Sequence, residues 1–141
     1  MTHILFVCTH NRCRSILCEA IARYYLPADF RVSSAGSAPA GEIYPQTLMA
    51  LDAAGFDTTN LRSKSWDEFE KAPPDLMVTV CDSAAGEICP LSFIRVRTER
   101  WGLPDPSKIE NEAEQSALFK TVIERIKAQL PIWEQMLTGQ Q

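Results

Sequence analysis

Residues 3–15 read HILFVCTHNRCRS, a short apolar run followed at once by a polar segment that holds two cysteines and two arginines. A continuous apolar run of this length is typical of a strand buried on both faces of a parallel sheet. Beyond Ser15, apolar residues recur at helical spacing as far as Tyr25, where a Leu-Pro pair ends the pattern. The stretch therefore predicts a strand over His3–Val7, a loop over residues 8–15, and a helix that follows the loop directly.

The rest of the chain continues this alternation of strands and helices. The pattern predicts strands at Phe30–Ala35, Leu76–Val80 and Phe93–Val96, helices at Ile43–Ala54 and from about Asn111, and a short helix or turn at Ser65–Lys71. Pro131 is expected to kink or end the last helix. Such alternation favours a doubly wound α/β fold with a parallel sheet, in which function collects at the carboxyl ends of the strands.

Length and composition fit one globular domain that spans residues 1–141. Hydrophobic residues make up 45% of the chain and charged residues 23%, which excludes a disordered tail, a collagen-like chain and a coiled coil. The net charge of −4 disfavours nucleic acid and anionic membranes as partners, because both require a broad basic surface. No apolar run approaches the ~20 residues of a membrane span.

The sequence also bears on the cellular compartment. The first residues show neither a basic lead-in nor a long apolar region, so we expect no signal peptide and a cytoplasmic protein. The chain has five cysteines, and an odd number in a reducing compartment argues against a framework of structural disulfides. These thiols are therefore either buried small hydrophobic residues or groups with a chemical role.

The loop after the first strand combines the elements of an oxyanion site. Because it runs into a helix N-terminus, its backbone N–H groups can converge on one tetrahedral anion. Arg14 adds a planar fork of donors, and the same positive field favours the thiolate of Cys8, to which Ser15 can donate a hydrogen bond. A thiolate beneath a bound oxyanion is placed for attack on its central atom. The residues expected to bind the oxyanion are Thr9, His10, Asn11, Arg12, Cys13, Arg14 and Ser15.

Other interpretations of single loop residues remain open. Cys13 can pack the loop or serve as a backup thiol, whereas Cys18 is expected to be a buried small residue of the first helix. His10 is expected to be exposed, and Asn11 suits the left-handed backbone that such a loop requires. A zinc site built from Cys8, His10 and Cys13 is not expected, because the spacing matches no standard pattern. We expect no metal and no bound cofactor.

Cys8 to Ser15 resembles the phosphate-binding loop of the low-molecular-weight protein tyrosine phosphatases and of the arsenate reductases that share their fold. The likeness continues through Ser34-Ala35-Gly36, through residues 41–55 and through Asp105-Pro106. It implies a flavodoxin-like domain whose four-stranded parallel sheet has the order 2-1-3-4, with helices on both faces. It also implies that Cys8 is the nucleophile, Arg14 the oxyanion clamp and Asp105 the general acid and base.

Two features separate the two branches of this family. Phosphotyrosine phosphatases usually place aromatic residues after the Asp-Pro pair, whereas here Ser107-Lys108-Ile109 follows. The segment that holds Cys81 and Cys89 resembles the loop of resolving thiols in arsenate reductases. With the implied strand order, Cys8 and Cys81 end neighbouring strands at the same edge of the sheet, at a separation that suits a disulfide.

The sequence thus predicts a thiol-dependent arsenate reductase. Cys8 attacks arsenate, Cys81 resolves the arsenic adduct, and Cys89 moves the disulfide outward to a reductant, either thioredoxin or a glutathione and glutaredoxin system. The order of Cys81, Cys89 or Cys13 in the relay stays open, and phosphate and sulfate are expected to compete with arsenate. The alternatives are a phosphatase of phosphomonoesters and a module that binds oxyanion or arsenite without turnover.

Overall fold

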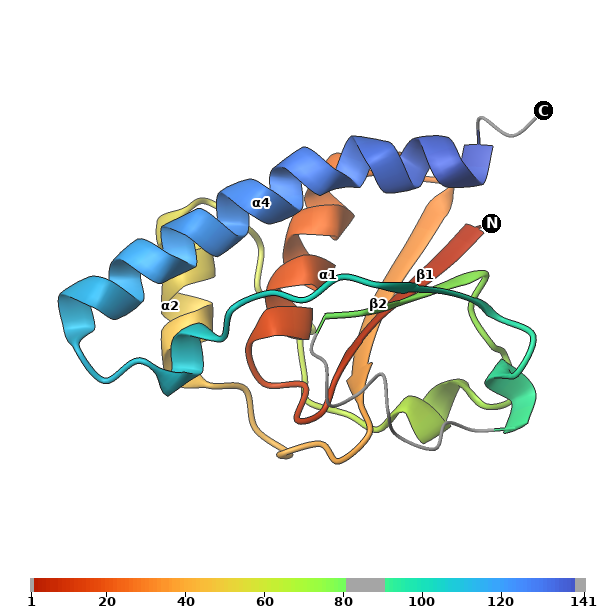
Figure 1. The fold of residues 1–141 in the computed structure, drawn as a ribbon, viewed down its shortest axis with the longest axis horizontal. Coiled ribbons are helices and arrows are strands. Elements are labelled where there is room, and N and C mark those ends of the chain that lie inside the picture. The colour runs from red at the N-terminus through yellow and green to blue at the C-terminus, as the bar shows by residue number, and fades with distance from the viewer. Residues whose placement is uncertain (1, 81–90, 139–141) are drawn as a thin grey trace.

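The computed structural model describes residues 2–80 and 91–138 as a parallel sheet with helices packed against it (Figure 1). Its strands are β1 (Thr2–Cys8), β2 (Phe30–Gly36), β3 (Leu76–Thr79) and β4 (Arg97–Arg100). Its α-helices are α1 (Arg14–Tyr25), α2 (Pro45–Ala53) and α4 (Glu112–Thr138). Three short 3₁₀ helices are η1 (Trp66–Phe69), η2 (Leu91–Phe93) and η3 (Pro106–Lys108).

The four strands are all parallel and have the order β2-β1-β3-β4, which confirms the predicted α/β fold and strand order. β1 pairs with β2 over its whole length, from Thr2 opposite Phe30 to Cys8 opposite Gly36. On its other side β1 pairs with β3, where Val7 lies opposite Thr79. The carboxyl ends of these strands therefore meet at one edge of the sheet, which is where ligands bind in such folds.

Alternate residues of β1 contact the layers on opposite faces of the sheet. The Phe6 ring lies 5.4 Å from the Trp133 ring of α4, measured between centroids. The His3 ring lies 5.6 Å from the Phe69 ring of η1. Since residues 3 and 6 point to opposite faces of a strand, α4 covers one face and η1 the other. Figure 1 shows α1 and α2 lying next to α4, and α1 also packs on β1 and β2.

The predicted strand over Phe93–Val96 is wrong, because the fourth strand lies at Arg97–Arg100. The apolar Phe93 instead ends η2, and its buried ring lies 6.4 Å from the ring of Trp66. β4 is the edge strand, mostly exposed and rich in charge, so it lacks the apolar pattern of an interior strand. Charged side chains of this kind protect a sheet edge from pairing with another chain.

Of the two outcomes expected at Pro131, a kink or an end of the last helix, the end is wrong, because α4 continues to Thr138. A proline inside a helix removes one backbone hydrogen bond, which costs about 3 kcal/mol. Beyond it, Trp133 is buried against Phe6 and Trp101, and burial of a side chain this large offsets the cost. Within residues 2–80 and 91–138, no helix is long and apolar enough to cross a membrane.

We expect Trp133→Ala to lower the free energy of unfolding by about 3–5 kcal/mol, the usual cost of removing a buried aromatic ring. Its neighbour in α4, Ile132, is 52% exposed and provides the matched control. Ile132→Ala should change the free energy of unfolding by less than about 0.5 kcal/mol. Urea titration followed by circular dichroism measures both, and equal effects of the two substitutions would contradict this account of α4.

Candidate active site at the carboxyl edge of the sheet

Cys8 ends β1, and its sulfur lies within hydrogen-bond distance of two groups that follow it in the chain. The Ser15 hydroxyl oxygen lies 2.9 Å from the Cys8 sulfur, and the backbone N–H of Asn11 donates to the same sulfur at 3.2 Å. Helix α1 begins at Arg14, immediately after the loop. The first N–H groups of a helix have no partner inside it, so they add positive potential near this sulfur. Both effects favour a thiolate at Cys8.

Asn11 holds the loop in shape from inside. It is completely buried and has a φ of 48°, which confirms the expected left-handed backbone. Its side-chain nitrogen donates to the Ser15 hydroxyl at 2.7 Å and to the Ser34 hydroxyl at 3.0 Å. Its side-chain oxygen accepts from the backbone N–H of Lys64 at 2.9 Å. Every polar atom of this side chain thus ties the loop to a neighbouring segment.

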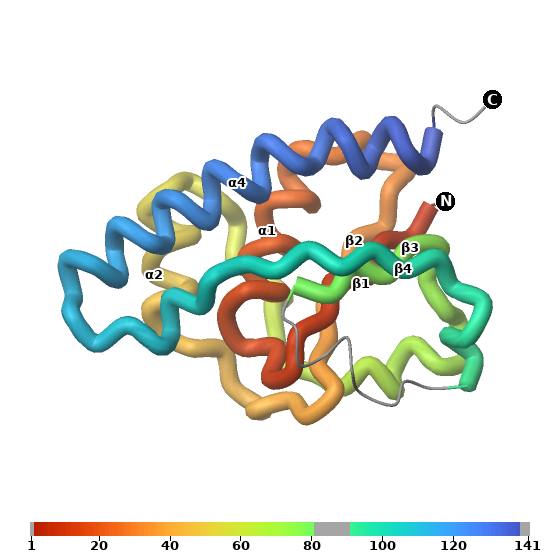
Figure 2. Tube along the Cα trace, in the orientation of Figure 1, coloured from red at the N-terminus to blue at the C-terminus, as the bar shows by residue number. Residues whose placement is uncertain are grey.

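The segment after β2 supports the loop from outside, and the two run side by side in Figure 2. Backbone N–H groups of Ala38, Ala40 and Tyr44 donate to the carbonyls of loop residues 9, 10 and 12 at 2.8–3.0 Å. At Gly36 a Cβ atom would lie 2.6 Å from the carbonyl oxygen of Thr9, which is closer than any real contact. Glycine is therefore required where the strand passes beneath the loop.

Arg14 and Asp105 meet beside the loop, although they are distant in sequence. Arg14 Nη2 lies 3.4 Å from Asp105 Oδ2, and Arg14 Nη1 donates to the carbonyl of Leu103 at 3.2 Å. Both side chains are mostly buried. The structure therefore places a planar cation and a carboxylate together at the edge where Cys8 ends its strand, the combination that oxyanion chemistry requires.

Ser107 orients the other oxygen of Asp105. Its backbone N–H and its hydroxyl both lie within hydrogen-bond distance of Asp105 Oδ1, at 3.0 and 2.7 Å. The same hydroxyl accepts from Arg12 Nη2 at 2.9 Å, and the Arg12 guanidinium lies 5.1 Å from the centroid of the Tyr44 ring. The carboxylate is therefore fixed, with Oδ2 on the side of Arg14.

Cys13 and Cys18 have environments unlike that of a reactive thiol. Burial raises the pKa of Cys13 to about 12 and places the pKa of Cys18 well above its ordinary value. Cys13 precedes α1, and Cys18 is completely buried within it, as expected for a small core residue. The predicted resolving thiols, Cys81 and Cys89, lie outside the described residues.

Other polar contacts of the site carry weak signals in the sequence. Ser34 and Tyr44 belong to segments that the family resemblance includes, but nothing in the spacing assigns them hydrogen bonds to the loop. Ser107 follows the Asp-Pro pair, where the sequence shows only that the residue is not aromatic. His10 is exposed, as expected, and its Nδ1 lies 3.2 Å from the carbonyl oxygen of Ala38. Among residues 2–80 and 91–138, no three His, Cys, Asp or Glu side chains are grouped to hold a metal ion.

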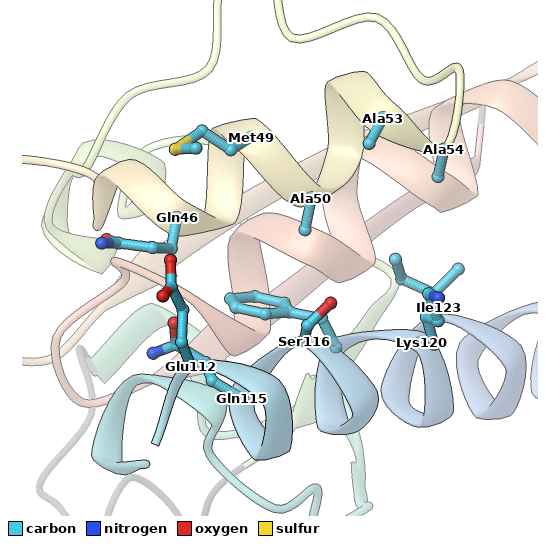
Figure 3. Close-up of a pocket in the computed structure, with 11 residues that line it drawn as sticks. Gln46, Met49, Ala50, Ala53, Ala54, Glu112, Gln115, Ser116, Lys120 and Ile123 are labelled. Carbon is cyan, nitrogen blue, oxygen red and sulfur yellow. The ribbon is translucent and has the colours of Figure 1, made fainter. Parts of the chain in front are cut away.

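A hollow of about 340 Å³ lies between α2 and α4, away from the catalytic loop (Figure 3). Figure 3 shows Ala50, Ala53 and Ala54 on one side and Ile123 on the other. Gln115 joins this region to the site, because its side-chain nitrogen donates to the Tyr44 hydroxyl at 2.7 Å. The hollow is mainly apolar, and the charged residues of its lining are Lys120 and Glu112, with no arginine fork for an oxyanion.

The raised pKa values of Cys13 and Cys18 predict that iodoacetamide leaves both thiols unmodified. At neutral pH, Cys13 and Cys18 remain protonated because their pKa values are raised, so the folded protein should show no alkylation of either. Peptide mapping by mass spectrometry measures the extent of modification at each position. The same reaction in urea, where both cysteines are exposed and react, is the control. Labelling of Cys13 in the folded protein at neutral pH would contradict the buried placement.

Comparison with known proteins agrees with the geometry. An arsenate reductase of Bacillus subtilis is 36% identical over 124 residues, which cover 87% of this chain and 88% of that protein. Two solved structures each superpose with a TM-score of 0.73. A thioredoxin-dependent arsenate reductase of Corynebacterium glutamicum is 26% identical, and the match covers 99% of this chain and 64% of that chain. An arsenate reductase of Archaeoglobus fulgidus is 25% identical, with coverages of 91% and 98%.

A match to a protein family covers almost the whole chain. Residues 3–141 fit the family described as low molecular weight phosphotyrosine protein phosphatase. The match includes the loop, the edge of the sheet where Cys8 lies, and the Asp-Pro pair, the same segments that carry the site geometry. The chain therefore belongs to the low molecular weight phosphotyrosine protein phosphatase family.

Proposed function

We propose that this protein is a thiol-dependent arsenate reductase. The observation that carries the proposal is the meeting of Cys8, Arg14 and Asp105 at the carboxyl edge of the sheet. A nucleophile, an oxyanion clamp and a proton carrier are the three groups that attack on a tetrahedral oxyanion requires. The curated relative from Bacillus subtilis, an arsenate reductase similar over 87% of this chain, supports arsenate as the substrate.

The first step is nucleophilic attack by Cys8 on arsenate. The loop from Thr9 to Ser15 and the guanidinium of Arg14 hold the anion, and the Cys8 thiolate forms a bond to arsenic. Asp105 supplies a proton to the departing hydroxide, which leaves as water. Because Ser107 holds Asp105 Oδ1, the proton is carried on Oδ2, the oxygen beside Arg14.

The second step is reduction of arsenic by thiols. The Cys81 thiolate attacks the Cys8 sulfur, and the sulfur–arsenic bond breaks with its electron pair remaining on arsenic. Arsenite leaves, and a disulfide joins Cys8 to Cys81. Support for this step comes from the pairing of β1 with β3, because Val7 lies opposite Thr79, close to where Cys81 follows in sequence.

The cycle closes with an external thiol reductant. Cys89 attacks Cys81, which frees Cys8 and moves the disulfide to the Cys81–Cys89 pair. Thioredoxin or a glutathione and glutaredoxin system then reduces that pair, and the similar protein from Corynebacterium glutamicum is described as thioredoxin-dependent. The raised pKa of Cys13 argues against Cys13 as the resolving thiol. No metal or bound cofactor takes part in this scheme, which runs in the cytoplasm.

Phosphatase activity is the second candidate function, and the family match supports it. The same thiolate, clamp and acid can cleave a phosphomonoester, with water resolving the phosphocysteine. The residue after Asp105-Pro106 argues for the reductase, because Ser107 bonds to Asp105 and Arg12 where a tyrosine phosphatase would have an aromatic wall. A module that binds oxyanion without turnover is the third possibility to be tested.

Parallel assays separate these functions. We expect the protein to reduce arsenate with a thiol donor much faster than it hydrolyses an aryl phosphate, and Cys8→Ser to reduce both rates to background because the nucleophile is lost. Cys18→Ser is the matched control and should keep the activity. Arsenate reduction by the Cys8→Ser variant would contradict the mechanism, and binding without turnover in the wild type would indicate a binding module.

Arg14→Lys tests the clamp. A lysine offers a point charge in place of a bidentate fork, so we expect a loss of about 10²-fold in kcat/KM for arsenate. Phosphate and sulfate should inhibit the wild type competitively, because they have the same shape and similar charge. Steady-state kinetics with and without phosphate give both results. Full activity in Arg14→Lys would show that the planar fork is not needed.

Removal of the predicted resolving thiols distinguishes reductase from phosphatase chemistry. Cys81→Ser should stop reduction after arsenic is bound, because no thiol attacks the Cys8 adduct. Cys89→Ser should accumulate the Cys8–Cys81 disulfide, because no thiol then attacks Cys81. Neither variant should lose aryl phosphatase activity, since hydrolysis of the Cys8 phosphocysteine intermediate needs only water and Asp105. Thiol mapping after one turnover detects the disulfides. Full reductase activity in the double variant would rule out the intramolecular relay.

A further inference from the structure

A buried ion pair lies beneath the catalytic loop and has no part in the steps above. Glu19 of α1 is 2% exposed, and its Oε1 lies 3.7 Å from the ammonium nitrogen of Lys64, which is 9% exposed. Arg23 is a second cation on the same carboxylate, and the Lys64 ammonium also donates to the carbonyl of Arg62 at 2.9 Å. Removing two charges from water is costly, so such pairs are rare without further hydrogen bonds.

Hydrogen bonds connect this pair to the nucleophile. The Ser34 hydroxyl donates to Glu19 Oε1, and the Asn11 side-chain nitrogen donates to Ser34 at 3.0 Å. The same Asn11 nitrogen donates to Ser15 at 2.7 Å, and the Ser15 hydroxyl oxygen lies 2.9 Å from the Cys8 sulfur. These groups form one continuous buried path from the carboxylate to the thiol.

The chemistry of each group sets the direction of this path. An ionised carboxylate can only accept, so Ser34 must give its single proton to Glu19 and accept from Asn11. The Asn11 nitrogen has two protons, and the second goes to Ser15. Since Ser15 accepts there, its own proton is available for the Cys8 sulfur 2.9 Å away. The path thus ends in an O–H donor aimed at the nucleophile, which stabilises the thiolate over the thiol.

Lys64 acts on this path at both ends. Its backbone N–H donates to Asn11 Oδ1, which turns the Asn11 nitrogen toward the two serines. Its ammonium lies beside Glu19 together with Arg23, and these cations compensate the buried carboxylate that accepts the Ser34 proton. Burial lowers the pKa of the Lys64 ammonium, and Glu19 opposes that shift.

We infer that Glu19 and Lys64 are positioning residues that make Cys8 reactive by fixing which way the protons of Ser34, Asn11 and Ser15 point. The inference rests on Cys8 being the nucleophile of the proposed function. It assigns a role to a buried pair that lies outside the oxyanion loop and touches no reacting atom.

The test measures the rate of Cys8 alkylation by iodoacetamide as a function of pH, with peptide mapping to isolate the Cys8 signal. In Ser34→Ala the path is cut between Glu19 and Asn11, and in Lys64→Met the buried cation is lost. Both should move the pH midpoint of Cys8 alkylation upward by about one unit, which makes alkylation about tenfold slower below the midpoint. Lys64→Arg keeps the charge and should lie closer to the wild type than Lys64→Met.

Arg62→Met is the matched control, because Arg62 is a neighbouring cation in an exposed ion pair with Glu68. Its midpoint should equal that of the wild type. An equal shift in Arg62→Met and Lys64→Met would mean that general loss of positive charge is responsible, and would overturn the inference. An unchanged midpoint of Cys8 alkylation in Ser34→Ala would also overturn the inference, provided that a cooperative unfolding transition shows this variant to be folded. If Lys64→Met does not fold, the Ser34→Ala result alone decides the test.

The measurement needs no arsenate, so its result is independent of the reductase assay. Shifted midpoints in a protein that does not reduce arsenate would support the positioning role and contradict the proposed function. Reductase activity with unshifted midpoints of Cys8 alkylation would support the proposed function and contradict the positioning role of Glu19 and Lys64.

Discussion

The site depends on the hydrogen bonds of the Asn11 side chain. The loop must leave β1, turn back toward the Cys8 sulfur and enter α1 within a few residues, and this path requires a left-handed backbone at Asn11. A buried loop also carries polar groups that need partners, since an unpaired buried donor costs about 1–3 kcal/mol. Asn11 satisfies both needs, because its amide bonds to two serines and to the backbone of Lys64. A single side chain thereby joins α1, β2 and the segment before η1.

The local charge of the site differs from the charge of the whole protein. The chain has a net charge of −4, which disfavours anions at long range. Binding of an oxyanion must therefore come from short-range donors, namely the start of α1 and Arg14. In the proposed mechanism, the position of Asp105 beside Arg14 lets one cation serve both the bound anion and the proton carrier. Such an arrangement relies on geometry rather than on electrostatic attraction from a distance.

The sequence predicted the elements that have strong local patterns. The apolar run before Cys8 and the helical spacing after Ser15 predicted the first strand and the first helix, whereas the strand order and the role of Asp105 came from the family resemblance. The structure confirms that order and brings Cys8, Arg14 and Asp105 to one edge. β4 was misplaced because an edge strand held by backbone bonds needs no apolar side chains. The contacts of Lys64 with Glu19 and Asn11 could not be predicted, because the residues lie in segments far apart in sequence and a charged side chain normally indicates a solvated surface.

The contact between Phe6 and Trp133 has a consequence for the synthesis of the protein. β1 leaves the ribosome well before α4, and its apolar face is covered by the Trp133 ring of that later helix. A nascent chain that has not yet reached residue 133 can form the β1–α1–β2 unit, but one face of its central strand stays open to water. Completion of the core must therefore wait for translation of α4, and during that interval the exposed strand is a natural substrate for chaperones.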